Sequence, residues 1–283
     1  MQARPNCVKD HVVILTGAAA GIGRSLVEAL LRHGASVVAA DLDQARLDAL
    51  QEEMHSEALA CVAIDVGEAG SGDRLVDTAL SRFGRLDAVI NNAGLGRYQI
   101  KNDVFQNPPK FWEANDAQWE RLMRVNANAV FFLMRAAIAH MMRQKRGRIV
   151  NVTTSMDSMV RGGMSPYGPT KAAAEALSSV AALDLEGTGV TVNVVVPGGP
   201  TDTGFIPDHV PIVRDKLLRP EVMVAPVLWL LSDEASAVTG MRFRANLWNE
   251  NDPVQDAIAR SGQPVGWLEQ GRGQMATDVI VFT

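Results

Sequence analysis

The segment TGAAAGIG, residues 16–23, decides the fold. A short apolar run precedes it at 11–15 and an amphipathic stretch follows it at 22–33, so we expect a strand, a glycine-rich turn and a helix. Glycines at this junction let the backbone approach a pyrophosphate closely, and the helix N-terminus favours the negative charge of the phosphates. The pattern predicts a nucleotide site with phosphate contacts from Gly17, Gly21, Ile22 and Gly23.

The alternation of short apolar runs and longer amphipathic stretches continues along the chain. Further strands are expected at 36–40, 58–64, 86–90, 147–152 and 190–196, and further helices at 42–54, 72–83, 116–143 and 166–187. The strands lack polar alternation, which is typical of parallel strands covered by helices on both faces. The sequence predicts an α/β protein with a single doubly wound, Rossmann-type domain over 1–250. A C-terminal extension, 251–283, is not expected to be an independent domain.

Composition excludes several classes of protein. The 283 residues are 47% hydrophobic and 21% charged, which excludes a disordered or fibrous chain. The net charge of −5 has its signs interspersed, so nucleic acid is not an expected partner. No stretch of eighteen uninterrupted apolar residues occurs and residues 1–10 lack an apolar run, so we expect neither a membrane span nor a signal peptide, and a cytoplasmic location. Cys7 and Cys61 lack the spacing of a disulfide framework or a metal site.

Asp41 is the expected partner of the adenosine ribose. It closes the second strand, eighteen residues after Gly23, where a carboxylate accepts hydrogen bonds from ribose hydroxyls and repels a 2′-phosphate. A base neither precedes Gly21 nor directly follows Asp41, so NAD is predicted in preference to NADP. Leu42, the residue after Asp41, is a further expected cofactor contact. Two alternatives remain: Asp41 caps the helix that begins near Asp43, or Arg24 reaches a phosphate.

Two short polar segments follow the third and fourth strands. Because the carboxyl ends of parallel strands form the ligand-binding edge of an open α/β sheet, both segments are expected to contact the cofactor. They supply Asp65 and Val66, and then Asn92, Ala93 and Gly94. The alternative is an ordinary turn in which asparagine amides, that of Asn91 in particular, satisfy local backbone groups.

Tyr167 and Lys171 are the candidate catalytic pair. Their spacing of four places a phenol and an ammonium on one face of a helix, one turn apart. A tyrosine with a pKa of about 10 is a poor base near neutrality, but a nearby cation favours the phenolate. Tyr167 can then take a proton from an alcohol or return it to a ketone. An exposed pair without function is the alternative, although the chain holds only one other tyrosine, Tyr98.

Over residues 9–240 the chain resembles the short-chain dehydrogenase/reductase family. The resemblance rests on TGAAAGIG at 16–23, NNAG at 91–94, NVTTS at 151–155, YGPTK at 167–171 and VNVVVPGG at 192–199. It implies hydride transfer between nicotinamide C4 and a carbinol or carbonyl carbon, with Tyr167 as acid and base. Lys171 would bind the nicotinamide ribose and lower the pKa of the tyrosine. Asn126 would be the fourth member, with a backbone that holds a water linking the lysine to solvent; its alternative is a packing amide.

The chain departs from the family at two places. The family's serine binds the substrate oxygen thirteen residues before the tyrosine; here Thr154 has that spacing and Ser155 follows it, and we favour Ser155 by residue type. After Pro197 and Gly198 the family presents a backbone N–H and a threonine to the carboxamide, but Pro200 has no N–H. With one inserted residue the spacing is recovered, so the carboxamide contacts are assigned to Thr201 and Thr203.

The surplus length lies in an insert and in the tail. The insert, 95–118, is rich in aromatic residues, which favours an apolar or ring-containing substrate; the alternative is an insert that packs only on its own protein. After Gly240 the segment MRFRANLWNEND replaces the short strand with which the family closes. We expect the run Val279–Thr283 to form an edge strand, a lid or an exchanged arm.

Two helices, 119–143 and 167–187, are apolar on more than one side. Either they are deeply buried, or their second face packs on another subunit, so we expect a homo-oligomer, a dimer or a tetramer.

The sequence therefore predicts an NAD(H)-dependent oxidoreductase that interconverts a secondary alcohol and a ketone, with no metal. Two alternatives are kept. One is an NAD-binding sensor or scaffold without turnover. The other is an enzyme that keeps the cofactor and performs epimerisation or dehydration.

Overall fold

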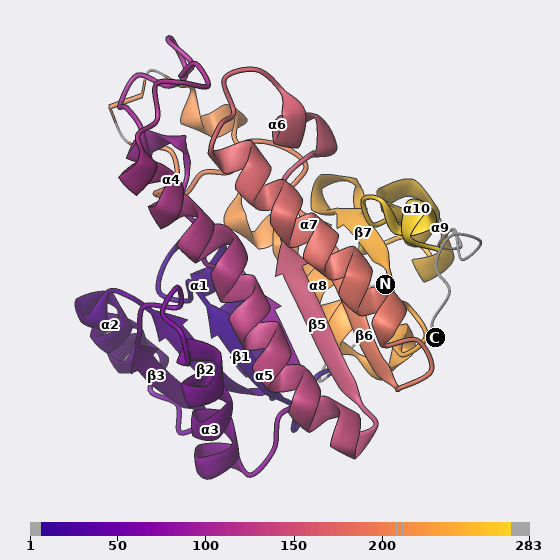
Figure 1. The fold of residues 1–283 in the computed structure, drawn as a ribbon. Helices are drawn as coiled ribbons and strands as arrows, with labels where there is room; N and C mark the ends of the chain where they lie inside the picture. The colour runs from indigo at the N-terminus through magenta and orange to yellow at the C-terminus, as the bar shows by residue number, and fades with distance from the viewer. Residues whose placement is uncertain (1–6, 208, 211, 273–283) are drawn as a thin grey trace, which may run out of the picture.

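A central parallel sheet organises the protein in the computed structural model, which describes residues 7–207, 209–210 and 212–272 (Figure 1). The strand order is β3-β2-β1-β4-β5-β6-β7-β8, and only the β7–β8 pair is antiparallel. The strands are β1 (Val12–Thr16), β2 (Ser36–Asp41), β3 (Leu59–Ala63), β4 (Ala88–Asn91), β5 (Gly147–Val152), β6 (Val190–Val196), β7 (Met241–Arg244) and β8 (Gly262–Pro264). This order confirms the predicted doubly wound, Rossmann-type α/β fold.

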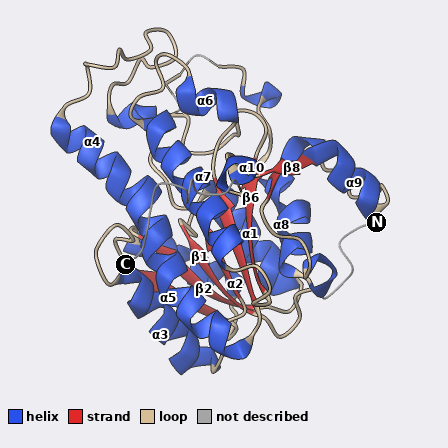
Figure 2. Ribbon diagram, turned by 45° about the vertical axis from the view of Figure 1, so that its right-hand side comes forward, coloured by secondary structure: helices blue, strands red, loops and turns tan. Residues whose placement is uncertain are grey.

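Helices cover both faces of the sheet (Figure 2). On one face lie α1 (Gly21–Arg32), α2 (Gln44–Met54) and α8 (Val224–Leu231); on the other lie α3 (Ser71–Phe83), α5 (Ala129–Gln144) and α7 (Tyr167–Asp184). In β1, Val13 and Leu15 pack toward the first layer while Val12 and Ile14 pack toward the second. Both faces of the strand are buried, which explains why its sequence is apolar without alternation.

The edge strand β3 differs from this expectation. Its first residue, Leu59, is buried, but residues 60–62 are half-buried and Ala63 is exposed. The prediction that every strand is buried on both faces is therefore wrong for β3, because an edge strand has a neighbour on one side only.

The segment after Gly240 forms a strand after all. Residues Met241–Arg244 make β7, which pairs in parallel with β6, so the expected loss of the closing strand is wrong. The chain continues through α9 (Val254–Ser261) into β8 and ends in α10 (Leu268–Gly271). The run Val279–Thr283 lies outside the described residues, and the boundary at residue 250 stays a prediction.

A long helical stretch, Asp116–Gln144, runs along the second face. It consists of α4 (Asp116–Met123), a π-helical turn η2 (Arg124–Asn128) and α5. Within the described part of the chain, only this stretch is long and apolar enough to cross a membrane, and 44% of its most apolar window is buried. The buried side chains of α5 pack into the core with α3 and the sheet, as a covering helix of the fold requires.

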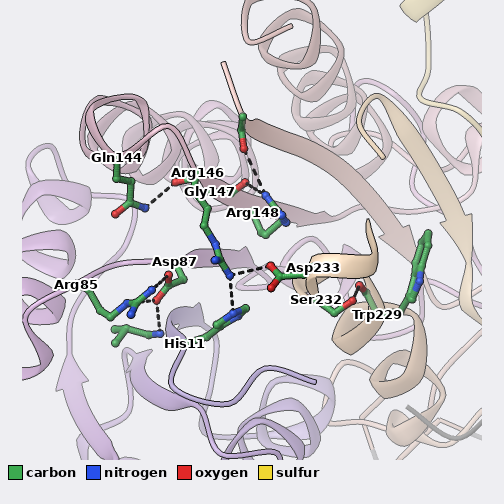
Figure 3. Close-up of polar contacts among 12 residues, drawn as sticks. His11, Arg85, Asp87, Gln144, Arg146, Gly147, Arg148, Trp229, Ser232 and Asp233 are labelled. Atoms are coloured by element: carbon green, nitrogen blue, oxygen red, sulfur yellow. Dashed lines mark hydrogen bonds and ion pairs between the residues drawn. The ribbon is translucent and has the colours of Figure 1, made fainter. Parts of the chain in front are cut away.

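Ion pairs close the amino ends of the strands (Figure 3). Asp87, before β4, accepts a hydrogen bond from Val12 N at 2.9 Å and pairs with Arg85 at 2.7 Å. Arg146, before β5, lies 2.9 Å from both Asp233 and His11. The glycine-rich turn lies at the opposite, carboxyl edge of the sheet, where ligands bind in open α/β folds.

Candidate active site

The glycine-rich turn between β1 and α1 is packed so closely that side chains do not fit. A Cβ atom at Gly23 would lie 1.9 Å from the Gly17 carbonyl oxygen, and one at Gly17 would lie 2.8 Å from the Ala93 Cα. Gly17 and Gly21 also have positive φ angles, 64° and 52°, that favour glycine. The first N–H groups of α1 have no helical partner, so the turn fits the pyrophosphate of a dinucleotide against Gly21, Ile22 and Gly23.

Asn92 holds this turn in place. Its amide nitrogen donates to the carbonyl oxygens of Thr16 and Gly17, each at 3.0 Å. The Thr16 hydroxyl in turn accepts hydrogen bonds from the N–H groups of Asn92 and Ala93, each at 3.1 Å. The Asn92 side chain therefore satisfies backbone groups of a distant segment, and the Asn91 amide donates to Asn151 Oδ1 at 2.8 Å. The alternative of an ordinary turn with local hydrogen bonds is thus wrong, and the predicted cofactor contacts of this segment stay a prediction. Thr16 was not singled out in the sequence, where its only signal is a hydroxyl at the end of an apolar strand.

Asp41 and Asp43 divide two tasks between them. The Asp41 carboxylate accepts hydrogen bonds from Ala19 N at 3.0 Å and Asp43 N at 3.2 Å, so it lies against the glycine-rich turn. Asp43, not Asp41, caps α2, by accepting a hydrogen bond from Arg46 N at 3.1 Å. The capping alternative for Asp41 is thus wrong. Leu42, next to it, is 70% exposed.

A cavity of about 360 Å³ opens beside Asp41, between α1 and α2. Its walls are Ala19, Ala20, Gly21, Arg24, Arg46 and Ala49. Both arginines are paired with acids. Arg24 lies 3.0 Å from Glu28 and 2.5 Å from Glu53, and Arg46 lies 3.1 Å from Asp43.

The segment after β3 connects to the π-helical turn. The Asp65 carboxylate accepts a hydrogen bond from Gly67 N at 2.9 Å and pairs with Arg124 of η2 at 3.0 Å. Val66 is buried beneath it. Both residues stand at the carboxyl edge of the sheet, as predicted from their place in the chain.

Lys171 is a buried cation at the centre of the site. Its Nζ donates to the Val152 carbonyl oxygen at 2.9 Å, and it lies 3.3 Å from where a Cβ atom of Gly94 would stand. The side chain is 5% exposed, and burial lowers the pKa of Lys171 to about 8. The alternative that Tyr167 and Lys171 form an exposed pair on the helix surface is therefore wrong, because the lysine is buried.

Tyr167 begins α7, one turn before Lys171. Burial raises the pKa of its phenol, while a hydrogen bond with the Thr154 side chain and the charge of Arg97 lower it. Arg97 was not singled out in the sequence. Its Nη1 donates to the Gly163 carbonyl oxygen at 3.1 Å, so Arg97 joins the insert to the loop that precedes Tyr167.

Thr154, rather than Ser155, presents its hydroxyl to Tyr167. Ser155 is the residue before α6 (Met156–Val160), and its Oγ lies 2.7 Å from the Ser158 Oγ in the first turn of that helix. The structure thus pairs Thr154, which has the spacing of thirteen residues, with the phenol, and pairs Ser155 with Ser158. Which of the two hydroxyls binds the substrate oxygen stays a prediction.

Asn126 lies in the π-helical turn and is fully buried. Its Oδ1 accepts a hydrogen bond from Leu95 N at 2.7 Å, and its Nδ2 donates to Leu95 O at 3.0 Å and to Thr170 Oγ1 at 2.9 Å. The side chain is a packing amide, as the alternative stated. The proposed role of its backbone toward a water stays a prediction; π-helical turns are frequent at functional sites.

The loop after β6 brings one of the two predicted threonines to the cofactor cradle. Thr203 packs so closely on Gly21 that a Cβ there would lie 2.9 Å from the threonine methyl. Thr201 instead donates to Gly199 O at 3.3 Å within its own loop. Gly198 has a φ of 90°, and a Cβ atom at this position would lie 1.8 Å from Asn246 Oδ1, so Pro197 and Gly198 are fixed by the segment after β7.

Only part of the insert reaches the catalytic edge. Phe205, from the loop after β6, packs edge-to-face on Tyr167 with ring centroids 5.9 Å apart, and Gly96 of the insert lies against Phe205. Phe111 and Trp112 are 77% and 79% exposed, so they do not line this part of the site. The insert and residues 159–169 enclose a separate groove of about 860 Å³.

The described residues contain no group of three side chains that could hold a metal ion. Cys7 and Cys61 are free thiols, and burial raises the pKa of Cys61 to about 11, which makes it a weak nucleophile.

A doubly wound sheet with a close-packed glycine turn, a tyrosine and a buried lysine at its carboxyl edge defines a nicotinamide-dependent oxidoreductase. The chain belongs to the short chain dehydrogenase family, whose model matches residues 11–208. It acts on CH–OH groups and interconverts a secondary alcohol and a ketone, as its relatives' names indicate.

Two curated relatives and one solved structure illustrate the family. The chain is 31% identical to 3beta-hydroxysteroid dehydrogenase 2 of Eggerthella lenta, over 84% of this chain and 95% of that protein. It is 31% identical to fluoren-9-ol dehydrogenase of a Terrabacter species, over 89% of this chain and 75% of that protein. The structure of 3-ketoacyl-(acyl-carrier-protein) reductase from Brucella melitensis complexed with NADH matches with a TM-score of 0.71 at 25% identity, over 82% of this chain and 94% of that chain.

Proposed function

We propose that the protein is an NAD(H)-dependent dehydrogenase in which Tyr167 is the acid and base and Thr154 binds the substrate oxygen. The observation that carries this proposal is the hydrogen bond between the Thr154 and Tyr167 side chains, one helical turn from the buried Lys171. A substrate hydroxyl between these two groups is oriented by Thr154 and loses its proton to the Tyr167 phenolate. In the opposite direction the phenol returns the proton to a ketone.

Lys171 and the glycine-rich turn hold the cofactor in this proposal. The ammonium has three donors and gives one to Val152 O, so two are left for the hydroxyls of the nicotinamide ribose. Gly17, Gly21, Ile22 and Gly23 would carry the phosphates, and Thr203, which packs on Gly21, would contact the nicotinamide carboxamide. When bound, NAD would supply the hydride acceptor for the carbinol carbon. Phe205 covers part of the half-buried Tyr167 ring.

The preference for NAD rests on Asp41 and its surroundings. The carboxylate lies against the turn, where it accepts from ribose hydroxyls and repels a 2′-phosphate. The two arginines that line the adjoining cavity are neutralised by Glu28, Glu53 and Asp43. A 2′-phosphate would therefore meet one carboxylate and no unpaired cation among the described walls of this cavity.

A ring-containing or apolar substrate fits the aromatic surroundings of Tyr167. Phe205 supplies a ring face beside the phenol, and Tyr98 packs on Phe105 of the insert with centroids 5.6 Å apart. The names of the relatives that act on fluoren-9-ol and on a steroid hydroxyl support the same class of substrate.

The face of α5 and α7 supports a homo-oligomer, for which we favour a tetramer. Both helices run along the same side of the sheet (Figure 1) and expose large apolar side chains: Phe131 is 46%, Met142 49% and Val180 58% exposed. A symmetric contact between two copies of this face would bury these side chains. We also infer that the enzyme works in the cytoplasm, which its free thiols support.

The test is a panel of cyclic and linear secondary alcohols with NAD and NADP. Net NADH formation is expected from the wild-type protein, and Tyr167→Phe should lower kcat by about a hundredfold or more, because the phenolate is the base. Tyr98→Phe is the matched control: it removes the other phenol of the chain and should keep kcat within a few-fold. Turnover without net NADH formation would favour the epimerase or dehydratase, and cofactor binding without turnover would favour the sensor.

A further inference from the structure

A fully buried ion pair lies directly behind the proposed catalytic hydroxyl. Glu175, on α7 one turn after Lys171, is 0% exposed, and Arg242, on β7, is 2% exposed. The Arg242 Nε lies 2.8 Å from Glu175 Oε1. Residues of these types are rarely buried unless they are paired, and even a paired burial carries a large desolvation cost.

Both members of the pair bond to the end of β5. The Arg242 Nη2 donates to the Thr154 carbonyl oxygen at 2.6 Å, and the Thr153 hydroxyl donates to Glu175 Oε2 at 2.7 Å. Arg242 thus holds Thr154, which carries the proposed catalytic hydroxyl, and Glu175 holds the preceding residue, Thr153. The backbone of Thr154 is fixed while its side chain points to Tyr167.

The C-terminal extension completes the network. The N–H of Gly266 donates to Glu175 Oε1 at 3.0 Å, and the Ser179 hydroxyl donates to Gly266 O at 2.5 Å. A Cβ atom at Gly266 would lie 2.9 Å from Glu175 Cγ and 3.1 Å from the Met156 methyl. Gly266 therefore packs against the Glu175 side chain and against Met156, the residue that follows Ser155.

Stability alone does not account for this arrangement. Replacing a buried ion pair by apolar side chains of similar volume is often neutral or stabilising, so the pair is weak evidence of a stabilising role. What an apolar pair cannot supply is a donor to the Thr154 carbonyl and an acceptor for the Thr153 hydroxyl. The specific effect of these hydrogen bonds is to fix the position of residues 153–154.

We propose that Glu175 and Arg242 are positioning residues that hold the Thr154 hydroxyl on Tyr167, and that the C-terminal extension, through Gly266, locks them in place. The inference rests on the proposed function of Thr154 and Tyr167. It gives the extension, which lies beyond the residues matched by the family model, a role in turnover.

The decisive variant is Glu175→Leu combined with Arg242→Met, which leaves no uncompensated charge and is expected to fold. We expect kcat for alcohol oxidation to fall about tenfold or more, because a displacement of about 1 Å costs up to about a hundredfold. The rising limb of the pH–rate profile should move to higher pH: the Thr154 hydrogen bond lowers the pKa of Tyr167, and its loss raises that pKa. NADH affinity, measured by fluorescence titration, should stay within about twofold.

Gly266→Ala tests the extension alone, with Ser261→Ala as its matched control. Ser261 is buried in α9 and donates only to Ala257 O at 2.7 Å, so its loss perturbs the extension without touching the network. Gly266→Ala should show the same shift in pH and a smaller loss of kcat, and Ser261→Ala neither. The proposal is overturned if the double variant folds, binds NADH and keeps the wild-type pH profile. In that case its kcat would fall only in proportion to the fraction of protein that is folded. If instead Tyr167→Phe keeps full activity, the proposed function itself fails.

Discussion

Lys171 carries a charge that the folded protein holds out of water. Its pKa of about 8 lies well below the value of 10.5 for a free lysine, and burial is the cause. The shift corresponds to about 3 kcal/mol of destabilisation of the folded state below pH 8, where the side chain is protonated both folded and unfolded. The residue that destabilises the folded state is thus one that the proposed mechanism requires.

Lys171→Met should therefore stabilise the protein while it abolishes most activity. At pH 7 we expect a gain of about 2 kcal/mol in the free energy of unfolding, since the lost bond to Val152 O offsets about 1 kcal/mol. As the pH rises from 8 to 10.5, the folded wild type loses the lysine proton before the unfolded chain does, so its stability rises and the difference narrows. Urea denaturation at pH 7 and pH 10 measures both; a variant less stable than the wild type at pH 7 contradicts this reading.

Asp41→Ala should change the choice of cofactor. Removal of the carboxylate abolishes its repulsion of a 2′-phosphate, and we expect the ratio of kcat/KM for NADP to that for NAD to rise about tenfold. Asp48→Ala is the matched control, because this exposed carboxylate of α2 accepts a hydrogen bond from Gln44 of its own helix, whereas Asp41 accepts one from Ala19 of the glycine-rich turn. An equal ratio in the two variants would remove Asp41 from the cofactor site.

At the scale of single residues, the sequence predicted those site residues that lie close to one another in the chain. Gly17 and Gly23, or Tyr167 and Lys171, lie within one turn or one helical face, so their relation is visible in the chain. The choice between Thr154 and Ser155 required the backbone at the start of α6. The pairing of Glu175 with Arg242 crosses 67 residues and could not be seen in one sequence.

Among the elements, the glycine-rich turn is the least tolerant of side chains. Gly23→Ala places a methyl group 1.9 Å from the Gly17 carbonyl, so the turn must move, and we expect NADH affinity to fall about tenfold or more. Gly162→Ala is the control, because no atom lies within 4 Å of its Cβ position and its φ is not in the left-handed region. Isothermal titration measures both; equal affinities would show that the cofactor does not require this turn geometry.

The strand β7 shows where element prediction failed. The letters MRFR suggest a polar segment, because two arginines flank the phenylalanine. Tertiary pairing changes this: Glu175 neutralises Arg242 within the core, while Arg244 stays exposed. The strand exists because its buried arginine finds a partner that only the fold supplies.

At the scale of the whole molecule, the outer face of α5 and α7 decides the assembly. Val180→Glu places a charge on the exposed side of α7 and should convert the proposed oligomer to a smaller species, because a buried unpaired charge is costly. Val160→Glu is the control, since Val160 is 78% exposed and belongs to α6, neither to α5 nor to α7. Light scattering that shows a monomer for the wild type, or the same mass for wild type and Val180→Glu, would contradict the proposed interface.

The overall architecture was predictable because each strand and helix carries its own periodicity, and because parallel strands with short connections allow few topologies. The extension was not, because β8 and α10 have only three and four residues, too few to show a periodicity. They are fixed by partners elsewhere, such as Phe243 opposite Gly262 and Glu175 beneath Gly266.

The small strand β8 also bears on how the molecule behaves at high concentration. An open sheet ends in a row of unpaired backbone groups that can recruit a strand from another chain and begin aggregation. Here the last strand has only three residues, its Pro264 has no N–H to offer, and α9 and α10 flank it in the chain. The extension that is proposed to position a catalytic hydroxyl thus also blunts the sheet edge that would otherwise invite self-association.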